Sequence, residues 1–513
     1  MAIRITGFSG LDIDSLVKDL MKAKRVPLDR LNQQKTKLEW QREQYRSINA
    51  KLVDFRNNKL FNYSLSSAIN ARKASVTGEG AFAVTAKANS TSVAGSLSIE
   101  VIELATAAYA RTDENNALNA TSSTLLKNLG FTAVEKDGNK IIEIEIVKNK
   151  DAGENEPEYK TITLSENATI GDLVREINAN NDLGLIAFFD DATGRLSLTA
   201  KQTGTGKIEL ASQFEEVFKL TDAEAGQQAV VVINGIETRR DSNTFTVNGV
   251  EITLNAAAPG KTAVINVTTD TDKIVDTIKT FINEYNSLID LLNKKVSEQR
   301  YRDYEPLTAD QKKEMKESEI ELWEEKAKSG LLRNDTTLTN LINDLRISIY
   351  TSVKVNGKDY NLLRDFGIET GTWEQKGKLI LKNEDQLRAA IEADPEAVMA
   401  FFTKQTTVTD PDIKDSPANT DNGLFNRLSA AFMRAIDQLA AKAGTSKFST
   451  DETVSFSPNS YIGEQLRQLE MRISDLNKKL NQMENRYYLQ FAAMEAAVNR
   501  YAAMSSSLFG MTM

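Results

Sequence analysis

One short pattern in this chain has the composition of a phosphate-binding loop. The stretch from Thr203 to Lys207 reads TGTGK, with glycines that could approach a phosphate and a lysine that could bind it. A phosphate loop begins with glycine where this chain has Lys201, and it ends with a magnesium-binding Ser or Thr where this chain has Ile208. We therefore interpret this segment as a glycine turn between strands.

Two acidic stretches have carboxylates at spacings that could bind a cation. The stretch 410–423 reads DPDIKDSPANTDNG, but Lys414 and Asp415 stand where a calcium loop needs a ligand and a glycine. Asp190 and Asp191 precede an Ala-Thr-Gly sequence that is typical of a turn. No acidic residue lies in a motif that selects it for acid–base work. The sequence therefore predicts no catalytic residue, no metal site and no cofactor.

The amino-acid composition lowers the expectation of an enzyme further. The chain has no cysteine and no histidine. It therefore lacks a thiolate nucleophile, a disulfide, a histidine base and the usual soft metal ligands. Carboxylates, lysine or tyrosine can still carry catalysis, but none is singled out here. We expect a protein that is not an enzyme.

Length and charge indicate a multidomain chain without a nucleic acid or membrane partner. A chain of 513 residues exceeds one hydrophobic core and predicts about three or four domains. The net charge of −9 is small for this length and does not favour nucleic acid. No stretch approaches the ~20 apolar residues of a membrane span, and the first ten residues lack the apolar run of a secretory signal.

The elements that could position functional surfaces are helices at both ends of the chain. In the last fifty residues, apolar positions alternate by four and three, which predicts a helix that packs along its whole length on another helix. Such a helix would be roughly 70 Å long. This seam comprises Ile462, Leu466, Leu469, Ile473, Leu476, Leu480, Met483, Tyr487, Gln490, Met494, Ala497, Tyr501, Met504 and Leu508.

A weaker heptad pattern occurs near the amino terminus. Its leading positions are Leu31, Leu38, Tyr45 and Leu52, and its companion positions are Gln34, Gln41, Ile48 and Phe55. Val26-Pro27 should interrupt the helix, so we expect a short separate helix over 14–24. We interpret both ends as packing and oligomerisation helices, which contact each other, sister subunits or both.

The middle of the chain, from about residue 74 to 269, changes to a period of two that predicts half-buried strands. Asn234-Gly235 and Asn248-Gly249 each lie between such strands and predict type I′ hairpins. One helix is expected over 169–178, with Thr169 as its cap.

Helical periodicity returns after Asp272. A capping-box sequence at Thr308 and Gln311 predicts a charged helix to about Lys328. Short strands are expected near 352–355, 378–381 and 453–456. We therefore predict an α+β, multidomain fold, in which both termini form a helical coiled-coil stalk and β-rich head domains are inserted into it.

Several segments together resemble the family of flagellar filament cap proteins, also called hook-associated protein 2. The segments at the two ends are SGLDIDSLVKDLM (9–21), RVPLDRL (25–31) and YYLQFAAMEAAVNRYAAMSSSLFGM (487–511). The interior segments are FINEYNSLIDLLN (281–293) and the charged stretch 304–335. The stretch 164–200 is similar to a repeat of flagellins and other axial proteins.

This resemblance implies a structural assembly factor. It would form a homo-oligomeric ring, a pentamer in the family, at the distal filament tip, where it promotes flagellin folding and insertion. It also implies hook-filament junction proteins and a cytoplasmic export chaperone as partners. Export would follow the flagellar type III route, so the protein would be secreted and extracellular. The alternatives are another axial protein, such as a flagellin or hook-filament junction subunit, and an adhesin for host glycan or mucin.

The resemblance and the change of periodicity together predict four domains: a terminal coiled-coil domain (1–45 and 460–513), a helical leg (46–75 and 272–459), a β-rich head domain (76–130 and 228–271) and an outer head domain (131–227).

The carboxy-terminal segment carries apolar residues on nearly every face after Arg486. A helix of this kind must be covered. We expect it to contact the chaperone and the filament, although it could instead pack inside its own subunit against the basic amino-terminal helix. The expected contact residues are Tyr487, Tyr488, Phe491, Met494, Val498, Tyr501 and Leu508.

Overall fold

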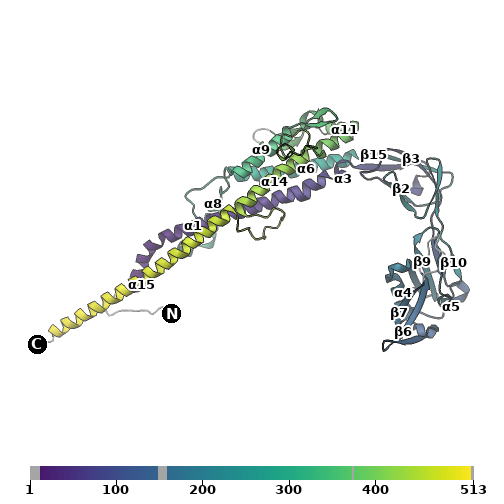
Figure 1. Cartoon of the computed structure of the whole chain (residues 1–513), viewed down its shortest axis with the longest axis horizontal. Coiled ribbons are helices and arrows are strands. Elements are labelled where there is room, and N and C mark those ends of the chain that lie inside the picture. The colour runs from purple at the N-terminus through teal and green to yellow at the C-terminus, as the bar shows by residue number, and fades with distance from the viewer. Residues whose placement is uncertain (1–11, 148–158, 372–374, 510–513) are drawn as a thin grey trace. The chain divides into compact units, whose positions relative to one another are not determined.

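The computed structural model describes residues 12–147, 159–371 and 375–509. The chain forms two compact units, one of Met1–Ile69 with Thr271–Met513 and one of Asn70–Asp270. The first is helical and the second is rich in strands (Figure 1). The predicted α+β class, with a β-rich part inserted into a helical one, is confirmed.

The helical unit is built on long helices from distant parts of the sequence. Helix α1 (Ile13–Asp54) passes into a π-helical turn, η1 (Phe55–Leu60), and then into the short helices α2 (Phe61–Ser64) and α3 (Ser66–Ile69). It lies along α15 (Tyr461–Phe509) and α14 (Leu424–Ala443). Aromatic rings pack in the core between these helices and α6 (Thr271–Ser297), with the Phe281 and Phe425 centroids 5.0 Å apart and those of Phe55 and Phe432 5.2 Å apart. The long elements are α1 (Ile13–Asp54), η1 (Phe55–Leu60), α6 (Thr271–Ser297), α9 (Thr336–Tyr350), α14 (Leu424–Ala443) and α15 (Tyr461–Phe509).

Shorter elements complete this unit. They are the helices α2 (Phe61–Ser64), α3 (Ser66–Ile69), α7 (Ala309–Glu314), α8 (Glu317–Lys328), α10 (Leu362–Phe366), α11 (Glu384–Ala393), α12 (Pro395–Thr403) and α13 (Pro411–Lys414). Two hairpins pair β16 (Val353–Val355) with β17 (Lys358–Tyr360) and β18 (Ile368–Thr370) with β19 (Leu379–Leu381).

The strand-rich unit contains two hydrophobic cores. The first lies between a five-stranded sheet, in the order β1-β15-β3-β11-β12, and a three-stranded sheet, β13-β14-β2. All pairings are antiparallel, and alternate side chains such as Leu97, Ile99 and Val101 are buried. The strands are β1 (Arg72–Thr77), β2 (Val84–Lys87), β3 (Gly95–Glu103), β11 (Ala229–Ile233), β12 (Ile236–Arg240), β13 (Thr244–Val247), β14 (Val250–Leu254) and β15 (Thr262–Thr269).

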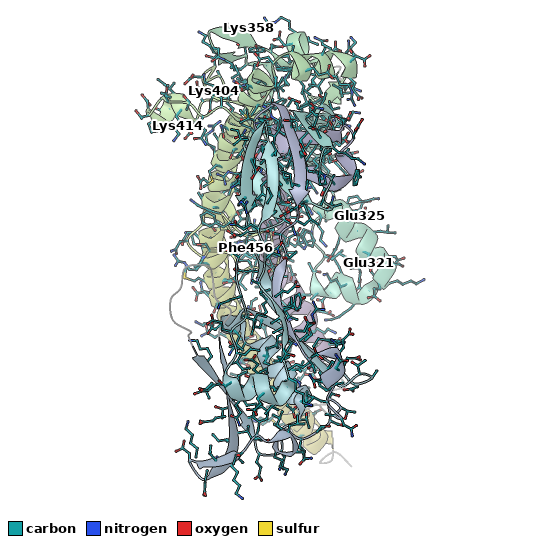
Figure 2. The ribbon with its side chains drawn as sticks, turned by 90° about the vertical axis from the view of Figure 1, so that its right-hand side faces the viewer. Glu321, Glu325, Lys358, Lys404, Lys414 and Phe456 are labelled. Atoms are coloured by element: carbon teal, nitrogen blue, oxygen red, sulfur yellow. The ribbon has the colours of Figure 1, made fainter. Side chains whose placement is uncertain are left out.

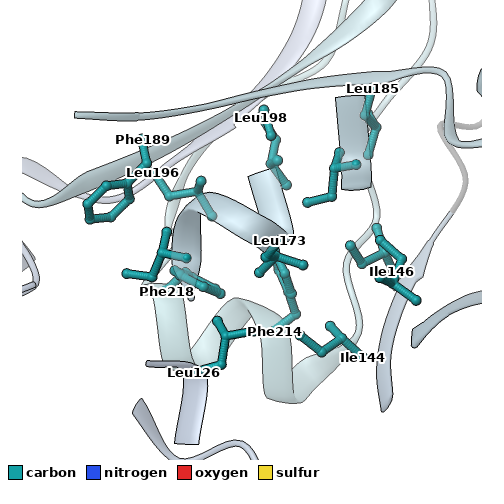
Figure 3. Packing of buried hydrophobic residues seen from close by; sticks show 14 of the residues in the cluster. Leu126, Ile144, Ile146, Leu173, Leu185, Phe189, Leu196, Leu198, Phe214 and Phe218 are labelled. Carbon is teal, nitrogen blue, oxygen red and sulfur yellow. The ribbon is translucent and has the colours of Figure 1, made fainter. Parts of the chain in front are cut away.

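The second core lies between two further antiparallel sheets and two helices. Figure 3 shows Leu173 of α4 and Phe214 and Phe218 of α5 among leucine and isoleucine side chains of both sheets. The sheets have the orders β10-β4-β9-β8 and β5-β6-β7. The elements are β4 (Ala107–Arg111), β5 (Ala133–Lys136), β6 (Asn139–Val147), β7 (Tyr159–Ser165), α4 (Ile170–Ala179), β8 (Leu185–Asp190), β9 (Arg195–Thr203), α5 (Ser212–Phe218) and β10 (Asp222–Glu224). Short 3-10 helices are Ala81–Ala83, Glu114–Asn116, Leu126–Leu129 and Asn181–Leu183.

The two predicted hairpins are confirmed. Asn234 and Gly235 have φ of 49° and 83° between β11 and β12, and Asn248 and Gly249 have φ of 50° and 80° between β13 and β14. Positive φ at both central residues is the type I′ geometry that matches strand twist. Thr169 caps α4 as predicted, and its partner in a full capping box is Asp172.

The predicted break at Pro27 is wrong, because α1 is continuous from Ile13 to Asp54. Proline lacks one amide donor, and that loss is tolerated where packing holds both sides of it. Met21 and Leu28, on either side of Pro27, pack in one cluster with side chains of α15. Tertiary contacts therefore override the local preference.

Two other expected elements differ in the structure. The charged helix after Thr308 begins with the predicted capping box but is divided into α7 and α8 by extended backbone at Met315 and Lys316. No strand occurs over 453–456. Instead, Phe456, labelled in Figure 2, stacks against two guanidinium groups. The central carbon of the Arg42 guanidinium lies 4.1 Å from the ring centroid, and that of Arg46 lies 4.5 Å from it.

The boundary between the two head domains also lies earlier than 130/131. β4 pairs with β9, and Leu126 is fully buried in the core shown in Figure 3. Ala105 belongs to the other core. The two cores therefore divide near residue 106, because β4 is a strand of the outer sheet although it follows β3 closely in sequence.

Candidate assembly surface on the terminal helices

Helices α1 and α15 pack against each other in antiparallel orientation. Two ion pairs connect them, Arg25 with Glu484 at 3.2 Å and Lys35 with Glu470 at 2.9 Å. The partner's number falls as the α1 number rises, which establishes the direction. The hydrogen bond to Glu470 raises the pKa of the Lys35 ammonium.

An apolar cluster forms where the amino-terminal part of α1 packs against α15. Ile13, Val17 and Met21 of α1 and Leu480 of α15 are buried there. Burial of side chains of this size stabilises the pair by roughly 1.5 to 3 kcal/mol each. The half-buried members of the cluster are Leu28, Leu476, Met483, Tyr487 and Phe491.

The residues of the two predicted seams mostly face the interior of the same chain. In α15, Ile462, Leu466, Leu469 and Leu480 are buried, while Ile473, Leu476, Met483 and Tyr487 are half-buried. In α1, Leu31 and Leu38 are half-buried, while Tyr45 and Leu52 are fully buried. These contacts lie within one subunit. A role of the seams in oligomerisation stays a prediction.

The predicted heptad register ends at Tyr487. After Tyr487, the Tyr488 side chain hydrogen-bonds with Asp14 of α1 and Phe491 packs in the α1 cluster, whereas the seam positions Gln490, Met494 and Tyr501 are exposed. Tyr487 and Phe491 thus reach the beginning of α1 at Ile13. Among the described residues, this is where the seam between α1 and α15 ends.

Beyond this point α15 carries a large apolar surface. Leu489 and Tyr501 are 72% and 73% exposed. Apolar side chains collected in this way mark an interaction surface rather than a free helix face. We call this surface the terminal patch. It comprises Tyr488, Leu489, Met494, Val498, Tyr501 and Met504. The side chain of Leu508 lies outside the described residues.

A segment that we call the side lobe, residues 298–335, holds α7 and α8 against α1. The amide of Gln33 donates to the Pro306 carbonyl at 2.8 Å, that of Gln41 to Leu331 at 3.2 Å and that of Gln44 to Lys328 at 2.9 Å. Backbone carbonyls need donors, and glutamine supplies them without a charge. This explains a glutamine inside the amino-terminal heptad pattern. The sequence predicted the lobe helices but not this contact, because its acceptors are backbone carbonyls.

A buried polar network joins α1, α9 and α14. Tyr45 donates to Asp335 Oδ2, which also accepts from Lys442, while Asp335 Oδ1 accepts from the Leu338 amide and caps α9. Burial acts to raise the pKa of Asp335, but these donors together hold it below its usual value. Tyr45 was predicted only as an apolar seam residue, so its hydroxyl role was missed.

The sequence patterns that looked chemical are turns and loops. Gly204 of the TGTGK segment has φ of 109° at the end of β9, and the Thr203 hydroxyl donates to the Asp241 carbonyl. Asp421 of the acidic stretch accepts from Lys404 and Thr406. Among the described residues, no group of three or more Asp or Glu is placed to hold a metal ion. In the same residues, no helix is both long and apolar enough to cross a membrane.

Family models match most of the chain. The model described as "Flagellar hook-associated protein 2 C-terminus" matches residues 226–503, and the one for the N-terminus of the same protein matches residues 9–108. A third, "Flagellin hook IN motif", matches residues 145–202, which include α4, β8 and most of β9.

Relatives and solved structures agree with these matches. The flagellar hook-associated protein 2 of Halalkalibacterium halodurans is 30% identical over 542 residues, covering 99% of each chain. That of Thermotoga maritima is 26% identical, covering 67% of this chain and 52% of the relative. The D1-D2-D3 domains of the flagellar cap protein from Escherichia coli share the fold, with a TM-score of 0.51, 19% identity and coverage of 83% of this chain and 99% of that one.

Proposed function

This chain belongs to the family of flagellar hook-associated protein 2, and we propose that it caps the distal end of a bacterial flagellar filament and promotes the folding and insertion of flagellin. The observation that carries this function is the similarity to a hook-associated protein 2 over 99% of both chains. The paired terminal helices and the inserted strand-rich unit supply a stalk and a head for such a cap.

The terminal patch supports the partners that this function requires. Its exposed apolar side chains need a cover, which neighbouring subunits and the filament supply in the assembled cap. In the cytoplasm, a dedicated export chaperone covers the same surface. The cap itself is a homo-oligomeric ring, a pentamer as in the family, that meets the hook-filament junction proteins before flagellin is added.

The route to the filament tip follows from the same proposal. The protein is exported unfolded through the flagellar type III route and remains extracellular at the distal tip. In the ring, the terminal coiled coil (1–45 and 460–513) and the helical leg contact the filament. The two head domains form the plate of the cap.

A complementation experiment tests the function. A bacterium that lacks its cap protein is supplied with the full chain or with a chain that ends at Arg486, and flagellin in the medium is measured. The full chain should restore filaments and the truncated chain should release flagellin, with its strand-rich unit still folded by circular dichroism. Normal capping by the truncated chain would overturn the role of the terminal patch, and failure of the full chain would overturn the function.

Point variants test whether individual side chains of the terminal patch carry this role. Leu489→Lys with Tyr501→Lys should weaken both chaperone binding in a pull-down and capping, because each lysine replaces an exposed apolar contact. The matched control is Tyr461→Lys, at the other end of α15, where the ring is 65% exposed. Mass photometry of the full chain should show closed rings, whereas a flagellin would form long filaments.

A further inference from the structure

A groove opens between α1, α15 and the side lobe. It has a volume of about 430 Å³ and is lined by nine residues. Three of them are leucines, Leu38, Leu331 and Leu469, and four are glutamines. We call it the lateral groove. Its apolar floor and hydrogen-bonding walls suit an inserted side chain rather than water alone.

The charge of the lateral groove has one sign. Lys37 and Arg472 are its only charged lining residues, and both are basic. Lys37 is paired with Glu305 of the side lobe, whereas Arg472 makes no hydrogen bond or ion pair with a described residue. An occupant should therefore combine an apolar side chain with neighbouring carboxylates.

The outward face of α8 has this chemistry. Leu322 is 63% exposed, although the helix buries Ala327 on its other side. Glu317, Glu321 and Glu325 follow one another at intervals of four and so form a row beside Leu322. None of the three carboxylates has a cationic partner within the described residues. Figure 2 shows Glu321 and Glu325 on α8, where it projects to the side of the long helices.

We propose that Leu322 of one subunit inserts into the lateral groove of a neighbouring subunit, with Glu321 and Glu325 facing Arg472. The opposite face of α8 is held by its own lobe, where the Trp323 indole donates to the Glu305 carbonyl at 2.8 Å. The outward face of α8 is therefore available to bind a second copy of the chain. A contact between two different surfaces of identical chains generates a ring when its rotation closes. This inference rests on the proposed cap and names the contact between its legs.

Cysteine cross-linking tests this contact directly, because the 513-residue chain contains no cysteine. Leu322→Cys and Gln468→Cys are made in separate chains, mixed and oxidised. A disulfide-linked dimer of the two variants should form rapidly, since each variant supplies only one half of the contact. Ile413→Cys, at a comparably exposed apolar position in the same unit, replaces Leu322→Cys as the matched control.

A charge exchange provides the second measurement. Glu321→Lys with Glu325→Lys should slow the cross-link severalfold, and Arg472→Glu in the partner should restore it. Added salt should slow the reaction of the parent pair, because the charges at its rim are exposed. Cross-linking no faster than with Ile413→Cys, in a chain that still forms rings by mass photometry, would overturn this contact and leave the proposed cap intact. Absence of rings from the chain without substitutions would count against the cap itself.

Discussion

The phenol of Tyr45 donates a hydrogen bond to Asp335 Oδ2 at 2.7 Å, which ties the middle of α1 to the first turn of α9. Both residues are buried, although they lie 290 positions apart in sequence. Asp335 also caps α9 through the Leu338 amide. A single carboxylate thus fixes the start of one helix and the position of another, and a buried network of this kind is costly to break.

Tyr45→Phe should lower the free energy of unfolding of the helical unit by about 2 kcal/mol, because a hydrogen bond to a charged acceptor is lost inside the protein. The ring and its packing are retained. Urea unfolding followed by circular dichroism measures the change. Tyr461→Phe is the control, since its ring is exposed and its loss of a hydroxyl should have no measurable effect. Equal stability of the two variants would contradict the role of the network.

Acid should remove the contribution of the Asp335 carboxylate to the free energy of unfolding. Its pKa is lowered in the folded state, so the carboxylate stabilises the fold at any pH above its unfolded pKa of about 4. That stability is lost as the pH falls through the lower, folded pKa. The difference in unfolding free energy between the parent and Asp335→Asn should therefore be constant at neutral pH and shrink below about pH 4. A difference that stays constant down to pH 2 would show that Asp335 carries no linked proton.

Valine substitutions at the glycines of the two hairpin turns should differ in their cost to stability. Gly235→Val should cost about 1 to 3 kcal/mol, because valine must adopt a positive φ, while the space around its Cβ is open. Gly249→Val should cost more, because its Cβ would also lie 2.8 Å from the Thr91 carbonyl oxygen. Hydrogen exchange of β11 to β14 in the full chain compares the two. The reverse order would mean that backbone conformation matters less here than the neighbouring loop.

Local sequence patterns were sufficient to predict much of the fold. The Asn-Gly turns, the Thr169 cap and the alternating strands depend on residues close in sequence, and the structure has all of them. Pro27 was misjudged because its effect depends on a helix more than 440 residues away. Local preference is weak where a long partner helix supplies the packing energy.

Contacts between distant segments could not be read from the sequence. Arg427 is fully buried and donates to the carbonyls of Ser348, Thr351, Ser352 and Asn419, so it closes the end of α9 without an acidic partner. An arginine on an amphipathic helix normally predicts a solvated face. The side lobe is a second case, because its acceptors are backbone carbonyls, which leave no trace in the residue types.

The packing of the terminal helices gives the last prediction. Leu480 is 3% exposed and belongs to the same apolar cluster as Ile13, Val17 and Met21 of α1. Leu480→Asp would place a carboxylate among these side chains without a partner, and it should destabilise the helix pair by at least about 3 kcal/mol. Faster hydrogen exchange in both α1 and α15 is the expected measurement.

The neighbouring Lys479→Asp is the matched control, because Lys479 is exposed and its substitution leaves the cluster intact. Capping should be lost with Leu480→Asp and retained with Lys479→Asp, since the terminal patch can be presented to the filament only by a helix that α1 holds in place. Equal exchange in the two variants would show that α15 is stable without α1. In that case the terminal patch would be supported by its own helix, and the antiparallel pair would serve some other purpose.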